Sequence, residues 1–174
     1  MVTNSILERY IIYHKAYQLY IMKILTVCLG NICRSPIAQG ILEAKIKEHG
    51  LGDWEVDSAG TSGWHSGEHP DKRAIQVCKK NGIDISRQVS RKITSEDLDY
   101  YDLILVMDTS NYRDVLALCN NKEQVKKIHL AMNYVFPDRN VAVPDPYYDN
   151  RFDEVFSMLD DAMERLVTAE SLVI

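Results

Sequence analysis

Short apolar runs alternate with amphipathic segments along most of the chain. Residues 23–29 (KILTVCL) form an apolar, β-branched run that stops at Gly30, as expected of a buried strand. Similar runs predict three further strands, at residues 54–58, 103–107 and 125–130. Strands that are continuously apolar are typical of a parallel sheet covered on both faces.

Between these runs, apolar residues recur at helical spacing. This periodicity predicts helices over residues 36–48, 70–81, 109–118 and 151–169, and a short helix at the capping box 94–97. For the first of these, Ser35 is the expected N-cap and Pro36 lies in the first turn. The fold class is therefore α/β: one three-layer α/β/α domain around a four-stranded parallel sheet, with a functional loop between the first strand and the first helix.

Two segments follow neither pattern. Residues 59–69 are rich in Gly and Ser and predict a loop. Residues 131–150 contain three prolines, and loops of this length in compact domains are often functional.

The chain is expected to comprise an N-terminal extension, residues 1–21, and one domain, residues 22–170. The extension lacks the basic start, uninterrupted apolar core and cleavage site of a signal peptide, and its apolar stretch is too short to span a bilayer. It is read as a helical or loosely ordered extension, or as sequence before a true start at Met22, with a membrane-surface or dimerisation role as the alternative.

Charge and cysteine usage narrow the class of protein. A formal net charge of −5 and a pI near 5.5 argue against nucleic-acid binding, which needs a positive surface. The four cysteines lack both a secreted disulfide framework and a C-x2-C zinc pair. Reduced thiols in a cytoplasmic protein fit best.

The loop after the first strand, Cys28-Leu29-Gly30-Asn31-Ile32-Cys33-Arg34-Ser35, carries the candidate chemistry. In a loop between a strand and a helix, several backbone N–H groups point toward one place at the helix N-terminus, where an anion can bind. Gly30 and Asn31 tolerate the unusual backbone conformations that such a loop needs. Arg34 can grip two oxygens of a tetrahedral oxyanion, and the same positive field favours an ionised Cys28 thiolate, a nucleophile placed to attack phosphorus.

Residues 27–36 (VCLGNICRSP) resemble the signature of the low-molecular-weight protein tyrosine phosphatases. The resemblance continues through residues 57–61 (DSAGT), Trp64, 106–108 (VMD) and 144–148 (PDPYY), and it covers about residues 22–168. It implies a phosphatase that hydrolyses phosphotyrosine through a cysteinyl-phosphate and needs neither metal nor cofactor. The implied partners are a tyrosine-phosphorylated protein or a small aryl phosphate, with inorganic phosphate or another oxyanion in the loop.

The resemblance also implies a role for each matching residue. Cys28, Arg34 and Asp145 would be catalytic, with Cys28 as nucleophile and Asp145 as general acid and then base. The phosphate would be held by Leu29, Gly30, Asn31, Ile32, Cys33, Arg34 and Ser35. Ser35 would hydrogen-bond the thiolate, while Asn31 and Ser58 would maintain the shape of the loop.

The expected substrate cleft is walled by Ile32, Trp64, Tyr147 and Tyr148. Related arginine phosphatases typically carry Thr at the position of Ile32 and lack the paired tyrosines, so phosphotyrosine is favoured over phosphoarginine. Family precedent also suggests that a tyrosine kinase regulates such proteins at the two tyrosines.

Two further alternatives stay open. Arsenate reductases of related fold relay oxidation to two cysteines close together in sequence, whereas Cys78 and Cys119 are far apart and are read as core residues. A catalytically silent phosphate- or phosphopeptide-binding module would need no general acid. The resemblance also implies that Cys33 is a redox partner that forms a reversible disulfide with the nucleophile, with a small packed residue as the alternative.

One departure from the family pattern concerns support of the loop. Many members carry a supporting His near residues 87–91, where this chain reads RQVSR. The hydrogen bonds that hold the loop must then come from other groups.

Overall fold

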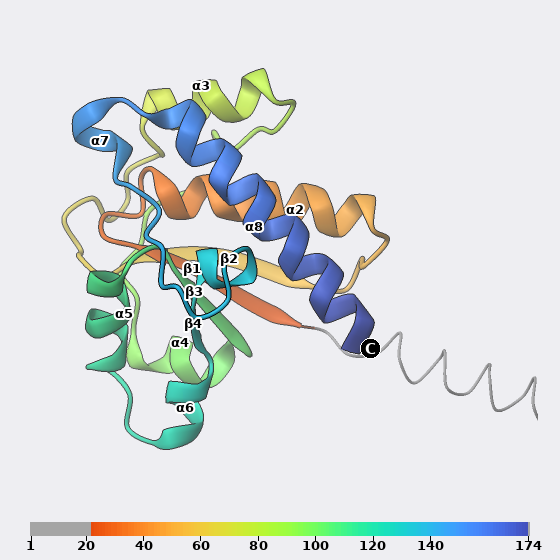
Figure 1. Cartoon of the computed structure of the whole chain (residues 1–174). Coiled ribbons are helices and arrows are strands. Elements are labelled where there is room, and N and C mark those ends of the chain that lie inside the picture. The colour runs from red at the N-terminus through yellow and green to blue at the C-terminus, as the bar shows by residue number, and fades with distance from the viewer. Residues whose placement is uncertain (1–21, 174) are drawn as a thin grey trace, which may run out of the picture.

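The computed structural model describes residues 22–173, with a parallel sheet at its centre (Figure 1). The strands are β1 (Lys23–Cys28), β2 (Glu55–Gly60), β3 (Leu103–Val106) and β4 (Ile128–Leu130). Their order is β2-β1-β3-β4, and Ile24 of β1 pairs with Val56 on one side and Leu103 on the other. The predicted four-stranded parallel sheet is confirmed.

Helices cover both faces of the sheet and complete the three predicted layers (Figure 1). One face carries α2 (Arg34–Glu48), α3 (Lys72–Lys80) and α8 (Phe152–Val173); the other carries α4 (Ser95–Tyr100), α5 (Thr109–Leu116) and α6 (Lys122–Lys126). Successive strand residues point to opposite faces, so Ile24 packs in the core under α2 and α8 while Leu25 packs in the core beside α4.

Helix α2 lies between the sheet and α8 and is buried on two sides, so it carries no one-sided apolar stripe. Its first turn is buried although it contains Arg34 and Ser35. The hydroxyl of Thr26 in β1 donates a hydrogen bond to the Ser35 carbonyl over 2.9 Å. This bond fixes the start of α2 relative to the strand that precedes the loop.

Several element boundaries differ from the sequence prediction. Helix α2 begins at Arg34 with Cys33 at its N-cap, so the predicted capping role of Ser35 is wrong. The expected strand at 125–130 is shortened to β4, because the Asn121 side chain caps α6 by accepting a hydrogen bond from the Gln124 N–H over 2.9 Å.

The proline-containing segment 131–150 is also less irregular than predicted. It contains a 3-10 helix, η1 (Ala131–Tyr134), and a short helix, α7 (Pro146–Asp149). The last helix continues to Val173, past its expected end. The expected extension, residues 1–21, lies outside the described residues.

Gly60 is the last residue of β2 and packs against the loop that follows β1. A substitution at this position tests how closely the sheet and the loop are packed. A Cβ atom at Gly60 would lie 2.8 Å from the Leu29 carbonyl oxygen, a backbone atom that cannot rotate away. We expect Gly60→Ala to lower the free energy of unfolding by about 1–3 kcal/mol, measured by urea denaturation.

Gly52→Ala is the matched control, because a Cβ atom there would meet no atom within 4 Å. It should leave the free energy of unfolding unchanged or slightly higher. Equal stability of the two variants would contradict the tight packing at Gly60.

Candidate active site

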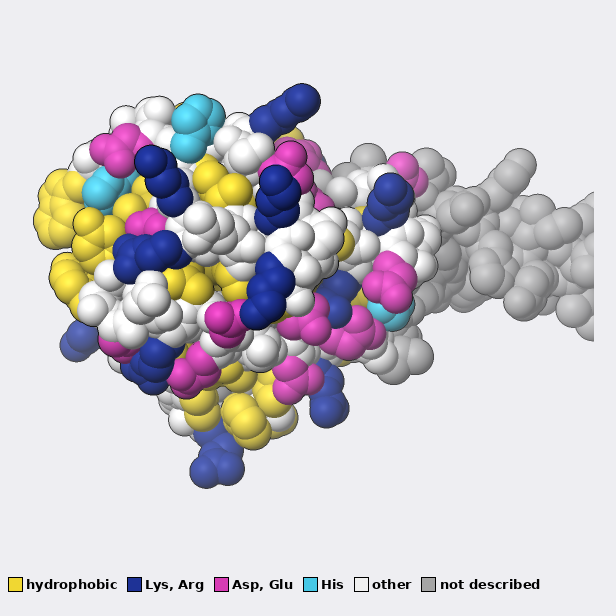
Figure 2. Space-filling model, turned by 90° about the horizontal axis from the view of Figure 1, so that it is seen from above, with side chains coloured by type: hydrophobic (Ala, Val, Ile, Leu, Met, Phe, Trp, Pro, Cys, Tyr) yellow, Lys and Arg dark blue, Asp and Glu magenta, His cyan; other side chains and the backbone are white. Residues whose placement is uncertain are grey.

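The loop after β1, the loop after β2 and helix α7 meet at the carboxyl edge of the sheet, on the left of Figure 1. They enclose a pocket of about 210 Å³. Its lining consists of Cys28, Leu29, Gly30, Ile32, Cys33, Arg34, Trp64, His65, Asp145, Tyr147 and Tyr148. Figure 2, viewed from above Figure 1, shows hydrophobic side chains gathered at the same end of the molecule.

Cys28 ends β1, and only 3% of its surface is exposed. The Asn31 N–H donates a hydrogen bond to its Sγ over 3.3 Å, and the Ser35 hydroxyl lies 3.1 Å from the same atom. The loop turns back over the sulfur because Asn31 adopts a left-handed backbone conformation with φ of 54°. An amide and a hydroxyl thus surround the Cys28 sulfur.

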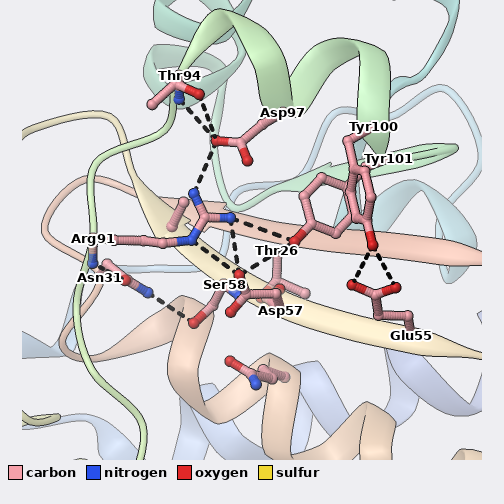
Figure 3. Close-up of polar contacts among 12 residues, drawn as sticks. Thr26, Asn31, Glu55, Asp57, Ser58, Arg91, Thr94, Asp97, Tyr100 and Tyr101 are labelled. Carbon is pink, nitrogen blue, oxygen red and sulfur yellow. Dashed lines mark hydrogen bonds and ion pairs between the residues drawn. The ribbon is translucent and has the colours of Figure 1, made fainter.

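The Asn31 side chain holds the loop from inside and is 1% exposed. Its Nδ2 donates to the Ser35 hydroxyl over 2.9 Å. The same nitrogen donates to the Ser58 hydroxyl, and Oδ1 accepts from the Arg91 N–H, each over 2.9 Å (Figure 3). The Ser90 hydroxyl donates to the Gly30 carbonyl over 3.1 Å. Residues 90 and 91 therefore supply loop support in the region where the family histidine is missing.

Arg34 brings a positive charge into the pocket, and only 3% of its surface is exposed. Its Nη1 donates to Asp108 Oδ2 over 2.7 Å and to the Val143 carbonyl over 3.1 Å. Burial opposes the charge, yet the interactions with Cys28, Asp145 and Asp108 raise the pKa of the Arg34 guanidinium above its ordinary value. The guanidinium is thus charged and fixed in orientation.

The two carboxylate oxygens of Asp145 have different partners: one caps a helix and the other lies at the pocket. Its Oδ1 accepts from the Tyr147 N–H over 3.1 Å and caps α7, where Pro146 occupies the first turn. Its Oδ2 accepts from Arg34 Nη2 over 3.1 Å. The cap holds the carboxylate at the pocket mouth without covering it.

Aromatic rings form the outer wall of the pocket. Trp64 is 78% exposed, Tyr148 is 86% exposed and Tyr147 is 44% exposed. The two tyrosine rings meet edge to face with centroids 5.2 Å apart, and Ile32 lines the same pocket. This wall presents apolar surface to a flat group entering the pocket.

Cys33 is 4% exposed and lies in the same loop as Cys28. Burial, followed by the charges of Asp71 and Cys28, raises the pKa of the Cys33 thiol above its ordinary value. Cys33 is therefore a neutral thiol beside the pocket.

Sequence reasoning gave no role to two residues of this site. Asp108 orients Arg34; the sequence signalled it by its position directly after the third predicted strand and by its place in the 106–108 motif, but gave it no role. His65 carries no sequence signal of a role, yet it lines the pocket, and a Cβ atom at Gly30 would lie 3.1 Å from its ring. Both contacts join distant parts of the chain.

Within residues 22–173, no group of three or more His, Cys, Asp or Glu side chains is arranged to hold a metal ion. Over the same residues, no helix is long and apolar enough to cross a membrane.

The parallel sheet, with a cysteine and an arginine in the loop at its carboxyl edge, has the features of a cysteine-dependent phosphatase. The chain matches the low molecular weight phosphotyrosine protein phosphatase family over residues 23–172. The human protein of that description is 43% identical over 132 residues, which cover 75% of this chain and 82% of the human one.

Solved structures agree with this assignment. YfkJ from Bacillus subtilis is 35% identical and superposes with a TM-score of 0.80, covering 86% of this chain and 94% of that chain. A Drosophila arginine phosphatase is 30% identical with a TM-score of 0.80, covering 86% of this chain and 98% of that chain. The chain belongs to the low molecular weight phosphotyrosine protein phosphatase family and is a phosphoric monoester hydrolase.

Proposed function

We propose that this phosphatase hydrolyses phosphotyrosine through a covalent intermediate on Cys28. The observation that carries the proposal is the convergence of three groups on one pocket: the Cys28 sulfur, the Arg34 guanidinium and the Asp145 carboxylate. A pure phosphate-binding module would need the first two at most, so the third favours catalysis.

In the first step, the Cys28 thiolate attacks phosphorus as the bond from phosphorus to the aryl oxygen breaks. Arg34 and the loop amides hold the equatorial oxygens, which carry the transition-state charge. The Asp145 carboxylic acid gives its proton to the departing aryl oxygen, so a neutral phenol leaves. Asp108 and Val143 keep the guanidinium oriented during this step.

In the second step, water attacks the phosphorus of the cysteinyl-phosphate. The Asp145 carboxylate takes a proton from that water, the bond between phosphorus and sulfur breaks, and Cys28 leaves as a thiolate with release of inorganic phosphate. The Ser35 hydroxyl, 3.1 Å from Sγ, stabilises the returning negative charge. Asn31 and Ser58 keep the loop in shape for both steps.

The walls of the pocket favour an aryl phosphate. Ile32, Trp64 and the two tyrosines line the same pocket as the Cys28 sulfur and present apolar surface to the ring of a phosphorylated phenol. The likeness to a Drosophila arginine phosphatase concerns the shared fold, so the choice between phosphotyrosine and phosphoarginine rests on these side chains.

Arsenate reduction is disfavoured by the places of the other cysteines. Cys78 is buried in the core under α2 and α8, whereas Cys119 packs with the core on the opposite face of the sheet. Two cysteines separated by a sheet cannot relay a disulfide from Cys28.

We also propose the domain bounds, the cellular location and a route of regulation. Residues 22–170 form the phosphatase domain and residues 1–21 an extension to it. The four free cysteines suit the reducing cytoplasm, where a catalytic thiol stays active. Tyr148, which is 86% exposed at the pocket mouth, is accessible to a regulatory tyrosine kinase.

The proposed substrate is tested by comparing phosphotyrosine and phosphoarginine in peptides of the same sequence. We expect a higher kcat/KM for the phosphotyrosine peptide, because the aromatic wall contacts the phenol ring. Cys28→Ser should abolish turnover of both peptides yet still bind inorganic phosphate. Turnover that survives in Cys28→Ser would overturn the mechanism, and a preference for phosphoarginine would overturn the substrate.

The acid role of Asp145 is tested with a series of aryl phosphates whose phenols differ in pKa. We expect Asp145→Ala to lower kcat by about 10²–10⁴-fold for poor leaving groups and by much less for good ones, since good leaving groups need no proton. Asp149→Ala, a change at the other end of the short helix that Asp145 caps, is the control and should leave the series unaltered. A uniform loss across the series would contradict the role.

We also propose that Cys33 protects the nucleophile from irreversible oxidation. Peroxide converts the Cys28 thiolate to a sulfenic acid; the Cys33 thiol then attacks that sulfur, which releases water and forms a disulfide. After peroxide and then dithiol treatment, Cys33→Ser should recover less activity than the parent or the control Cys119→Ser. Equal recovery in all three proteins would count against the disulfide.

A further inference from the structure

A second polar cluster is centred on Arg91 (Figure 3). Its guanidinium donates from Nε to Asp57 Oδ2 and from Nη1 to Asp97 Oδ2, each over 2.9 Å. The Tyr101 hydroxyl donates to the same Asp57 oxygen over 3.2 Å. Arg91 itself does not line the pocket, so any effect on catalysis must pass through other residues.

The two carboxylates belong to different elements. Asp57 is in β2, next to Ser58, whose own N–H donates to Asp57 Oδ1 over 2.7 Å. Asp97 is in the first turn of α4 and accepts from the Thr94 N–H over 2.8 Å. The guanidinium therefore fixes Arg91 between the sheet and the start of a helix. Burial opposes its charge, yet Asp97 and Asp57 raise the pKa of Arg91 above its ordinary value.

The Arg91 backbone determines how the Asn31 amide is turned. A backbone N–H can only donate, so the group that it meets over 2.9 Å must be the oxygen Oδ1. The Asn31 nitrogen then faces Ser35 and Ser58 and donates to both.

The orientation of the Asn31 amide also determines where the Ser35 hydroxyl proton can point. Ser35 has one hydroxyl proton, and its oxygen already accepts from Asn31. The proton is therefore available to Cys28 Sγ at 3.1 Å, with the Ala59 carbonyl at 3.3 Å as the other acceptor. A thiolate accepts such a hydrogen bond more strongly than a neutral carbonyl does.

We propose that Arg91 is a positioning residue: its ion pairs with Asp57 and Asp97 hold the backbone N–H that directs the Asn31–Ser35 hydrogen bonds toward the Cys28 thiolate. The inference rests on the proposed function, because it needs Cys28 as the nucleophile. The Arg91 carbonyl accepts from the Gly60 N–H over 2.8 Å, so the rival explanation is that the backbone alone suffices and the side chain only stabilises the fold.

The decisive readout is the pH dependence of Cys28 alkylation by iodoacetate, which reacts with the thiolate. Titratable groups that share the pocket with Cys28 are Cys33, Arg34, His65, Asp145, Tyr147 and Tyr148. None of them is altered by a change at Arg91. Arg91→Lys keeps a positive charge beside Asp57 and Asp97, so a shift in its alkylation midpoint reports the hydrogen bonds that pass through Asn31 and not the loss of a charge.

We expect Arg91→Ala to move the alkylation midpoint to higher pH and to lower kcat by about 10–100-fold. The dependence of kcat on the leaving group should stay that of the parent, because Asp145 is untouched. Arg91→Lys keeps the positive charge but cannot hydrogen-bond two carboxylates as a guanidinium does. Its alkylation midpoint and kcat should lie between those of the parent and of Arg91→Ala. Arg165→Ala removes an exposed arginine of α8 and should match the parent in every readout.

Two results would overturn the inference. One is a lower Tm for Arg91→Ala with the parent's alkylation midpoint and kcat, since the side chain would then be purely structural. The other is an additive loss in the Arg91→Ala, Asn31→Ala double variant, because residues on one path should together lose no more than Asn31→Ala alone.

If Arg91→Ala does not fold, other variants still test the proposal. Asp97→Asn weakens one of the two ion pairs and should shift the midpoint in the same direction by a smaller amount. A parent-like midpoint in both Asp97→Asn and Arg91→Lys would overturn the proposal. Failure of the proposed function is a separate outcome, seen as turnover that survives Cys28→Ser.

Discussion

A charged guanidinium held almost out of contact with water beside a cysteine sulfur is the constraint on which the rest of this structure depends. Burying a cation is costly unless it is paired and hydrogen-bonded. Arg34 is compensated by Asp108, which follows β3, and by the Val143 carbonyl and Asp145, which lie together in the segment before α7. The contacts that stabilise the arginine also orient it for its proposed role of holding an oxyanion, so stability and the proposed chemistry depend on the same atoms.

The fold supplies what such a site requires. Parallel strands end at one edge, so the loops after β1 and β2 meet there, and helix α2 starts directly beneath the pocket. The two cores on either side of the sheet hold these ends rigidly, because successive strand residues are buried in opposite directions. Behind the loop, Asn31 and Arg91 extend this support away from the pocket, which leaves the front of the site to the substrate.

Much of this arrangement could be predicted from the sequence because it depends on local patterns. The run at residues 23–29 and the turn at Gly30 are visible in the chain itself. The partners of Arg34 and Arg91 were not predictable in this way, since Asp108 and Asp57 are brought to them only by strand order. The capping role expected of Ser35 failed for a related reason, because its hydroxyl turns toward Cys28 and Asn31.

The most direct test of the account is a crystal structure with vanadate, which mimics the phosphoryl group in transfer. The account predicts vanadium bonded to Cys28 Sγ, equatorial oxygens on Arg34 and the amides of the loop, and the Asp145 carboxyl at the apical oxygen opposite the sulfur. Vanadium bound to another side chain, or a Cys28 sulfur turned away from the guanidinium, would contradict it.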